Sequence, residues 1–359
     1  MNPSLAERRT VDGRQDAKSR LPKVHLKRTV LLVIISFVLS LGLVEILSRL
    51  FLPSPVSQFI PSENFRLIYE LNPRYPQINS MGMRDEEVDR SSLADNFVIA
   101  AIGDSHTYSL FSEKRETTFP ARLQHHLHAI TGERIRVLNF GVPGYNMTQE
   151  LEVLRTKVLP IRPNLIVLQY TINDEHISNY IQPRYSRLNK AINQSVFLTQ
   201  FWTKFLYSRF GQRHFAYYVE TYAPDLLLFA PGLIGTPKPR EKDPAHAPHP
   251  PRSPEQVPKR YHEFIGRDNL EKAVRTFGQA AKAEQIPLMA TGFIETGDEA
   301  LYEEAGFQVR SFYRIFEGVK MQDHGYNPAR TSGHFKESGS DLIAEALARF
   351  ISTNFRISK

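Results

Sequence analysis

The stretch "VIAAIGDSHTYSL", Val98–Leu110, decides the fold of this chain and also raises the question of its function. Five apolar residues run into Gly103-Asp104-Ser105-His106, after which the chain becomes polar. An apolar run that ends in small polar residues is typical of a buried strand followed by a tight turn. The serine is therefore either an ordinary turn residue or a reactive group delivered by the strand.

The composition excludes several kinds of chemistry. The chain has 359 residues, 41% of them hydrophobic, which is enough for a domain with a real core. It contains no cysteine, so disulfides, thiolate metal sites and a cysteine nucleophile are excluded. Most of the net charge of +7 lies before Thr29, where eight basic residues face three acidic ones. We therefore expect no nucleic-acid partner.

An apolar segment follows this basic tail. Val30–Val44 carries no charge, and Glu45 and Arg49 stand one helical turn apart, where they can pair. At about 1.5 Å per residue, Val30–Leu52 would extend over roughly 35 Å, against about 30 Å for a bilayer core. We predict a single membrane-spanning helix over residues 29–52.

The positive charges on the N-terminal side of the apolar segment predict its orientation. They place the tail, residues 1–28, in the cytoplasm and everything after Pro53 on the other side of the membrane. In a bacterial cell that membrane would be the inner (cytoplasmic) membrane and that side the periplasm. Two alternatives stay open: a cleaved signal peptide and a buried core helix.

Strand and helix patterns alternate after a proline-rich connector over residues 53–96, which we expect to be irregular and to pack on the edge of the domain. The alternation predicts a parallel sheet covered by helices. The predicted strands are Phe97–Gly103, Ile135–Gly141, Leu165–Tyr170, Ile286–Gly292 and an edge strand at Val309–Phe312. The predicted helices are Thr118–Ile130, Thr148–Val158, Leu270–Ala283 and Ser338–Ile351.

An insertion over residues 181–261 interrupts this pattern. Its first part is rich in aromatic residues at helical spacing and holds the only tryptophan, Trp202. It predicts a helical subdomain, either with its own apolar face or as a cap over the membrane or the substrate. The second part is too rich in proline for regular structure. His246 and His249 lie there without nearby carboxylates, so we predict no metal site.

Three predicted strand ends carry candidate reactive groups. Ser105 follows the first strand, Gly144 the second and Asn173 the third, and ligands bind at the carboxyl ends of parallel strands. A serine nucleophile needs a base and preorganised donors for the oxyanion. The amides of Ser105 and Gly144 and the side chain of Asn173 can be those donors, and we expect Gly144 to open a helix. His334, in a loop before the last helix, is the best placed base. Each piece alone is also compatible with an ordinary turn.

Together these blocks resemble the SGNH hydrolases, also called the GDSL esterase/lipase superfamily. The resemblance lies in Gly103-Asp104-Ser105 and in "NFGVPGYN", "VLQYTINDEH" and "GHFKESGSDLIAEAL"; "INSMGMRDEE" (Ile78–Glu87) is similar to a lead-in of membrane-anchored bacterial members. It implies a three-layer α/β/α domain with a flavodoxin-like parallel sheet over residues 97–355. It also implies Ser105 as nucleophile, His334 as general base and an oxyanion hole of Ser105, Gly144 and Asn173, without metal or cofactor.

The chain departs from the family pattern at two positions. Thr171 stands where a glycine usually precedes the oxyanion asparagine, and Thr331 stands where the aspartate of the triad is expected. Three outcomes stay open: a Ser-His dyad oriented by a backbone carbonyl, an acid from elsewhere such as Asp323, or a protein that binds without hydrolysing. Loss of the acid costs about 10⁴-fold in the serine-protease case.

Other polar residues near the motifs receive lesser roles. Asp104, Asp174 and Thr331 are expected to support the site. His106 and His176 are interpreted as substrate contacts or as turn residues.

The prediction is thus a membrane-anchored extracytoplasmic serine esterase. Among ester substrates, the resemblance to anchored bacterial members favours an O-acetyl group on a cell-envelope carbohydrate, with a lipid ester second. Two alternatives remain: an O-acyltransferase that uses the same site, and a catalytically silent binding or scaffold protein of an envelope assembly.

Overall fold

The computed structural model describes residues 23–51, 58–177, 195–197, 254–256, 259–327 and 332–357. The chain divides into two units, one of Met1–Ser54 with Ser195–Phe197 and one of the remaining residues. Most of the predicted insertion, including Trp202, His246 and His249, lies outside the described residues.

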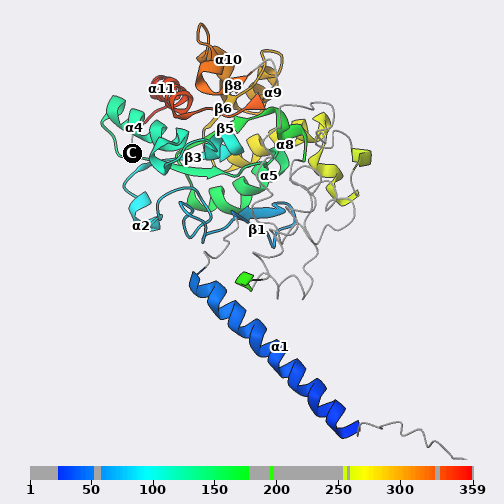
Figure 1. The fold of residues 1–359 in the computed structure, drawn as a ribbon. Coiled ribbons are helices and arrows are strands. Elements are labelled where there is room, and N and C mark those ends of the chain that lie inside the picture. The colour runs from blue at the N-terminus through cyan, green and yellow to red at the C-terminus, as the bar shows by residue number, and fades with distance from the viewer. Residues whose placement is uncertain are drawn as a thin grey trace, which may run out of the picture. The chain divides into compact units, whose positions relative to one another are not determined.

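The first unit is built on the helix α1, Lys23–Phe51 (Figure 1). By length and composition its part Lys27–Phe51 can cross a membrane, as can the apolar part of a signal sequence. Glu45 and Arg49 form the predicted ion pair at 2.8 Å. The Glu45 carboxylate also accepts hydrogen bonds from the Ser195 hydroxyl at 2.7 Å and from the Val196 amide at 3.0 Å.

The second unit contains a five-stranded sheet with the order β4-β3-β5-β6-β7, and all neighbouring strands in it are parallel. Counted along the chain this order is 2-1-3-4-5, which is the flavodoxin-like order. The parallel, flavodoxin-like sheet is therefore confirmed. Its strands are β3 (Phe97–Gly103), β4 (Ile135–Gly141), β5 (Leu165–Tyr170), β6 (Leu288–Gly292) and β7 (Phe307–Ser311).

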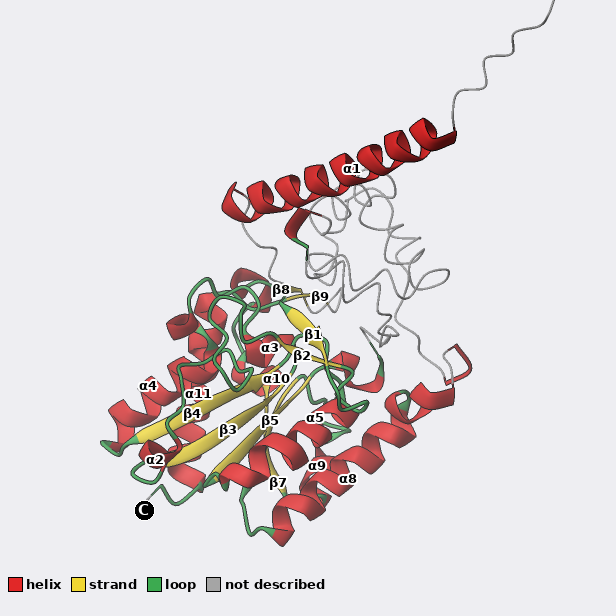
Figure 2. Ribbon diagram, turned by 90° about the horizontal axis from the view of Figure 1, so that it is seen from below, coloured by secondary structure: helices red, strands yellow, loops and turns green. Residues whose placement is uncertain are grey.

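Each face of the sheet carries its own hydrophobic core. Alternate residues of β3 point to opposite faces, so Val98 and Ala100 belong to one core and Ile99 and Ala101 to the other. The first face is covered by α5 (Met147–Val153) and α8 (Arg267–Ala283), the second by α4 (Phe119–Thr131) and α11 (Glu337–Asn354). Figure 2 shows the sheet between these two pairs of helices, which is the predicted three-layer architecture.

Several element boundaries differ from the predicted ones. The helix predicted over Thr148–Val158 is α5 followed by a π-helical turn, Leu154–Val158. Strand β6 starts at Leu288 and not at Ile286; Pro287, which has no N–H to donate, contributes only its carbonyl, which accepts from the Ile166 amide at 3.1 Å. The structure also describes short elements that the sequence patterns did not indicate: β1 (Phe59–Pro61), β2 (Tyr69–Leu71), α2 (Arg90–Leu93), α3 (Ser105–Tyr108), α9 (Glu299–Glu304), α10 (Phe312–Ile315), β8 (Tyr326–Asn327) and β9 (Ser332–Gly333).

The connector before the sheet is more ordered than expected. It was predicted to be irregular, but β1 and β2 pair antiparallel within it. Leu67, Leu71 and Met83 are buried in the same core as α5 and α8. These apolar residues are spaced irregularly between polar residues and prolines, so the sequence offers no period from which to predict strands.

A close approach at the carboxyl end of β4 fixes the position of α3. A Cβ atom added to Gly141 would lie 2.3 Å from the backbone nitrogen of Tyr108, which is in α3. Only a residue without a side chain lets the short helix lie directly on this strand end.

We expect Gly141→Ala to destabilise the protein by about 1–3 kcal/mol, because backbone atoms of α3 would have to move to relieve the overlap. The free energy of unfolding can be measured by denaturant titration of the detergent-solubilised chain. Gly297→Ala is the matched control, since a Cβ there meets nothing within 4 Å. Equal stability of the two variants would contradict this account of the strand end.

Candidate active site

The nucleophile candidate Ser105 lies where β3 passes directly into α3. Asp104 is the N-cap of this helix, and its Oδ1 accepts a hydrogen bond from the His106 amide at 2.9 Å. The side chain of Asp104 is completely buried, while Ser105 is half-buried. The cap thus begins the helix at Ser105 and sets this residue at the carboxyl edge of the sheet.

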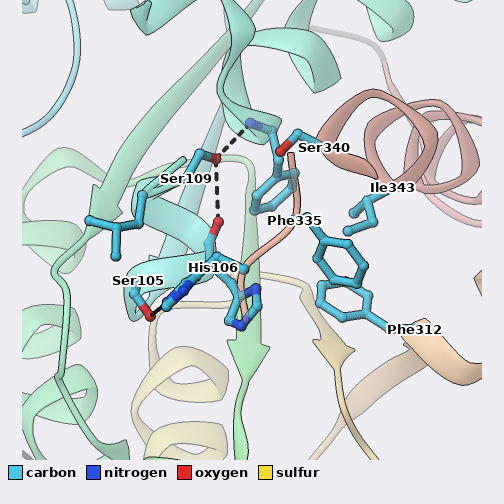
Figure 3. A pocket seen from close by; sticks show the side chains of 10 residues that line it. Ser105, His106, Ser109, Phe312, Phe335, Ser340 and Ile343 are labelled. Carbon is cyan, nitrogen blue, oxygen red and sulfur yellow. Dashed lines mark hydrogen bonds between the residues drawn. The ribbon is translucent and has the colours of Figure 1, made fainter. Parts of the chain in front are cut away.

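The structure brings His334 to Ser105 from the far end of the chain. The Nε2 atom of His334 lies 2.8 Å from the Ser105 hydroxyl oxygen, which is hydrogen-bond distance. His334 follows β9 and precedes α11. Ser105 and His334 line a small pocket whose wall includes the buried rings of Phe119, Phe312 and Phe335. Figure 3 shows Ser105, Phe312 and Phe335 in this wall.

The protonation of His334 suits a general base. Burial and, to a smaller extent, the neighbouring His106 lower its pKa to about 4, and the charge of Asp104 opposes this shift. The ring is therefore neutral at pH 7 and can accept a proton through Nε2.

The two other strand ends bring Asn173 and Gly144 together on the same edge. Asn173 lies in a short 3₁₀ helix, Ile172–Glu175, and its side-chain amide donates to the carbonyl of Tyr145 at 3.0 Å. Gly144 adopts φ of 80°, a left-handed conformation that favours glycine. Helix α5 begins only at Met147, so Gly144 precedes the helix and does not open it as expected.

Tyr69, in the connector before the sheet, is hydrogen-bonded to the residues on either side of Gly144. The Tyr69 hydroxyl donates to the carbonyl of Pro143 at 2.8 Å, and the Tyr145 hydroxyl donates to the carbonyl of Tyr69. The two rings contact edge to face, with centroids 5.2 Å apart. Residues before the sheet therefore fix the turn that would bind the oxyanion.

Sequence reasoning missed Arg84, which lies in the stretch "INSMGMRDEE" and supports the nucleophile helix. Its buried guanidinium donates to the carbonyls of Tyr108 at 3.1 Å, Ser109 at 2.7 Å and Ser112 at 2.6 Å. Carbonyls at the end of a helix have no partner within that helix. Arg84 supplies the missing donors. The only signal for it in the sequence was the resemblance to the lead-in of anchored proteins.

Thr171, the first departure from the family pattern, connects the third strand to the nucleophile turn. Its hydroxyl donates to Asp104 Oδ1 at 3.2 Å and accepts from the side chain of Gln169 at 2.6 Å. Gln169 in turn accepts from the Thr107 amide at 3.1 Å. A glycine could not make these bonds. Sequence reasoning missed Gln169, because no sequence pattern distinguishes this polar residue within a buried strand.

The acid that would complete a triad is not supplied by the candidate named from the sequence. Thr331 lies outside the described residues. Asp323 is exposed, and no hydrogen bond joins it to His334 within the described part of the chain. Among the described residues, the charge of Asp104 opposes the lowering of the His334 pKa, but burial raises the pKa of Asp104 itself. The Oδ2 of Asp104 also accepts a hydrogen bond from the Ser105 hydroxyl at 3.2 Å.

Two further carboxyl groups lie buried near Asp104. Both side-chain oxygens of Glu150 and the Oδ1 of Asp174 have no hydrogen-bond partner among the residues that the structure describes. Burial raises the pKa of both groups well above the ordinary value. The charge of Asp104 adds to the shift of both groups, and that of Glu150 adds to the shift of Asp174. Within the described ranges, no group of three potential ligands could hold a metal ion. These shifts favour the neutral, protonated form of Glu150 and Asp174.

The structure describes both histidines beside the motifs. His106 lines the pocket next to Ser105; only 9% of it is exposed, and its ring stacks on that of His334. Burial lowers its pKa to about 3. The backbone carbonyl of His176 accepts a hydrogen bond from Asn146 at 3.0 Å.

Comparison with known proteins gives matches to solved structures. No protein-family model and no curated protein sequence matches this chain. The matching structures include a lipase/acylhydrolase from Enterococcus faecalis, with 12% identity over 73% of this chain and 98% of that chain and a TM-score of 0.40. They include esterase EstA from Pseudoalteromonas sp., with 10% identity, 72% and 98% coverage and a TM-score of 0.40. A third is Axe2, an acetylxylan esterase from Geobacillus stearothermophilus, with 13% identity, 73% and 96% coverage and a TM-score of 0.39.

These matches are to esterases and lipolytic hydrolases, the kind of protein that the sequence motifs resemble. Their identities and TM-scores are too low for the relatives to decide what this chain does.

We expect the buried Glu150 to make stability depend on pH. The pKa of Glu150 is raised in the folded state, so its contribution to the free energy of unfolding is greatest at pH values below the pKa in the unfolded chain. As the pH rises above that value, this contribution is lost at up to about 1.4 kcal/mol per pH unit. Glu150→Gln cannot ionise, so the stability of this variant relative to the native chain should increase between pH 5 and pH 8. Denaturant titrations at several pH values measure this difference.

The matched control for this experiment is Glu303→Gln, which removes an exposed carboxyl group of α9. Its stability should follow that of the native chain at every pH. Parallel curves for Glu150→Gln and the native chain would show that Glu150 is not held in its protonated form.

Proposed function

We propose that this chain is a membrane-anchored serine esterase of the SGNH hydrolase type. The observation that carries the proposal is the 2.8 Å contact between the Ser105 hydroxyl and His334 Nε2 at the carboxyl edge of the parallel sheet. Asn173 and the Gly144 turn lie on the same edge, joined by the hydrogen bond from Asn173 to Tyr145. A nucleophile, a base and oxyanion donors on one edge are what acyl transfer requires.

The mechanism follows from these groups. Ser105 Oγ attacks the ester carbonyl while its proton passes to His334 Nε2, and a tetrahedral oxyanion forms. The amides of Ser105 and Gly144 and the side chain of Asn173 stabilise that negative charge. The C–O bond to the alcohol then breaks, His334 returns the proton to the leaving alkoxide, and an acyl-enzyme remains. In a second round, water attacks the acyl carbon while one of its protons passes to His334 Nε2. The bond between the acyl carbon and Ser105 Oγ then breaks, His334 returns the proton to Oγ, and the acid is released.

The environment of His334 sets the expected rate. Its pKa of about 4 makes it a weak base, and Asp104, rather than a residue of its own loop, opposes this depression. General-base catalysis is most efficient when the pKa of the base lies near the working pH. We therefore propose a slow esterase, whose rate depends more on how the protein positions the substrate than on the strength of the base.

The anchor and the substrate class complete the proposal. Helix α1 would hold the active site outside the cytoplasmic membrane, with the basic tail inside. Acetyl esters of envelope carbohydrates are the proposed substrates, with lipid esters second. Transfer of the acyl group to a sugar hydroxyl would proceed through the same acyl-enzyme.

We expect the full-length chain, purified in detergent, to hydrolyse p-nitrophenyl acetate. Ser105→Ala should reduce the rate to background, and His334→Ala should reduce it by about 10²–10⁴-fold, the usual contribution of a general base. Release of p-nitrophenol measures both. Ser91→Ala and His128→Ala, which change exposed residues of the same types, should retain full activity.

Two outcomes would contradict parts of this proposal. Turnover that survives in Ser105→Ala would exclude Ser105 as the nucleophile. A native chain without turnover, even with acetylated xylan or mannan as substrate, would exclude the hydrolase and favour transfer to a specific acceptor or a silent binding protein.

A further inference from the structure

The ring of His106 is placed by the same turn that carries the nucleophile. The His106 amide donates to Asp104 Oδ1 at 2.9 Å, and its carbonyl accepts from the Ser109 amide at 3.1 Å. Figure 3 shows the residue beside Ser105, directed toward the interior of the pocket. Its orientation is thus tied to that of the serine one position before it.

Aromatic side chains confine this ring on its other sides. The ring centroids of Phe293, Phe335 and Tyr326 lie 5.2, 5.6 and 5.9 Å from that of His106, all in edge contact. These three neighbours and the burial of all but 9% of the residue restrict the plane of the imidazole. A face of the His106 ring is therefore held in one direction.

That face lies against the candidate base. The rings of His106 and His334 stack at a centroid distance of 4.9 Å and an interplanar angle of 27°. Phe111 adds an edge contact to His334 at 5.2 Å. The imidazole of His334 is therefore restrained by two contacts: its Nε2 is at hydrogen-bond distance from Ser105, and its ring face packs against His106.

We propose that His106 is a positioning residue, whose ring holds the imidazole of His334 against Ser105 in place of the acid that normally orients the base. The inference rests on the proposed function, since it assigns a role in that reaction. His106 transfers no proton. It restricts the rotation of His334 and so keeps Nε2 of that ring on the hydroxyl of Ser105.

The charge state of His106 agrees with this role. Its pKa of about 3 keeps the ring neutral at physiological pH, because the site is desolvated. A protonated His106, with its ring centroid 4.9 Å away, would repel the imidazolium that forms on His334. The charged group that favours the imidazolium is Asp104, on the same turn.

The experiment compares His106→Phe, His106→Leu and Phe316→Leu in the full-length chain. His106→Phe keeps a flat ring and should retain kcat within about 3-fold, while His106→Leu should lower kcat about 10-fold with KM unchanged, as expected for a loss of orientation. Phe316→Leu is the control, because it removes a buried ring stacked on Phe335, and no ring contact joins it to His334 among the described residues. Equal kcat values in His106→Leu and Phe316→Leu would overturn the proposal.

A spectroscopic readout separates this inference from the proposed function. The carbon-bound ring protons of His334 should show a ring-current shift in the NMR spectra of the native chain and His106→Phe. The shift should be lost in His106→Leu and kept in Phe316→Leu. If the shift follows this pattern while the native chain hydrolyses nothing, the ring stack is supported and the proposed esterase activity is contradicted. If the native chain is active and the shift is the same in all four proteins, the esterase activity is supported and the positioning role of His106 is contradicted.

Discussion

The hydrogen bond between Ser105 and His334 depends on one constraint, the direct passage of β3 into α3 at a capped turn. Asp104 caps the helix, and Gly141 lets α3 lie on the end of the neighbouring strand. Arg84 supplies the donors that the last carbonyls of α3 lack. A shift of this turn by one ångström would break the 2.8 Å contact with His334, so much of the surrounding packing serves to hold it in place.

Burial both enables and limits the chemistry of this site. Removal of water strengthens each electrostatic interaction, but it also disfavours charge. It lowers the pKa of His334 to about 4 and raises the pKa of Glu150 well above its ordinary value. The base is consequently neutral but weak, and Asp104 is the charge that supports its protonated form. The aromatic surroundings of His106 and His334 then take over part of the orientation for which a triad uses an acid.

The sequence predicted the parts of the fold that follow regular patterns. The strands over Phe97–Gly103, Ile135–Gly141 and Leu165–Tyr170 have the predicted bounds, because buried parallel strands are continuous apolar runs bounded by turn residues. The parallel, flavodoxin-like order followed from the motifs. The predicted site residues Ser105, Gly144, Asn173 and His334 lie at the same edge of the sheet, although their roles remain predictions.

What the sequence could not predict are contacts without a local period. Gln169 is a polar residue in a strand whose partners come from another turn, and Arg84 acts on carbonyls 24 or more residues away. The role of His106 depends on rings from β8 and from the residue after β6, which only the folded chain brings together. Each of these follows from tertiary packing and not from the neighbouring residues.

The most direct test of the central claim, that Ser105 is a nucleophile activated in this environment, is mass spectrometry after treatment with a fluorophosphonate. The account predicts one phosphonyl group per chain, on the peptide that contains Ser105, with much slower labelling when His334 is replaced by alanine. A chain that stays unlabelled, or that is labelled at another serine, would contradict it.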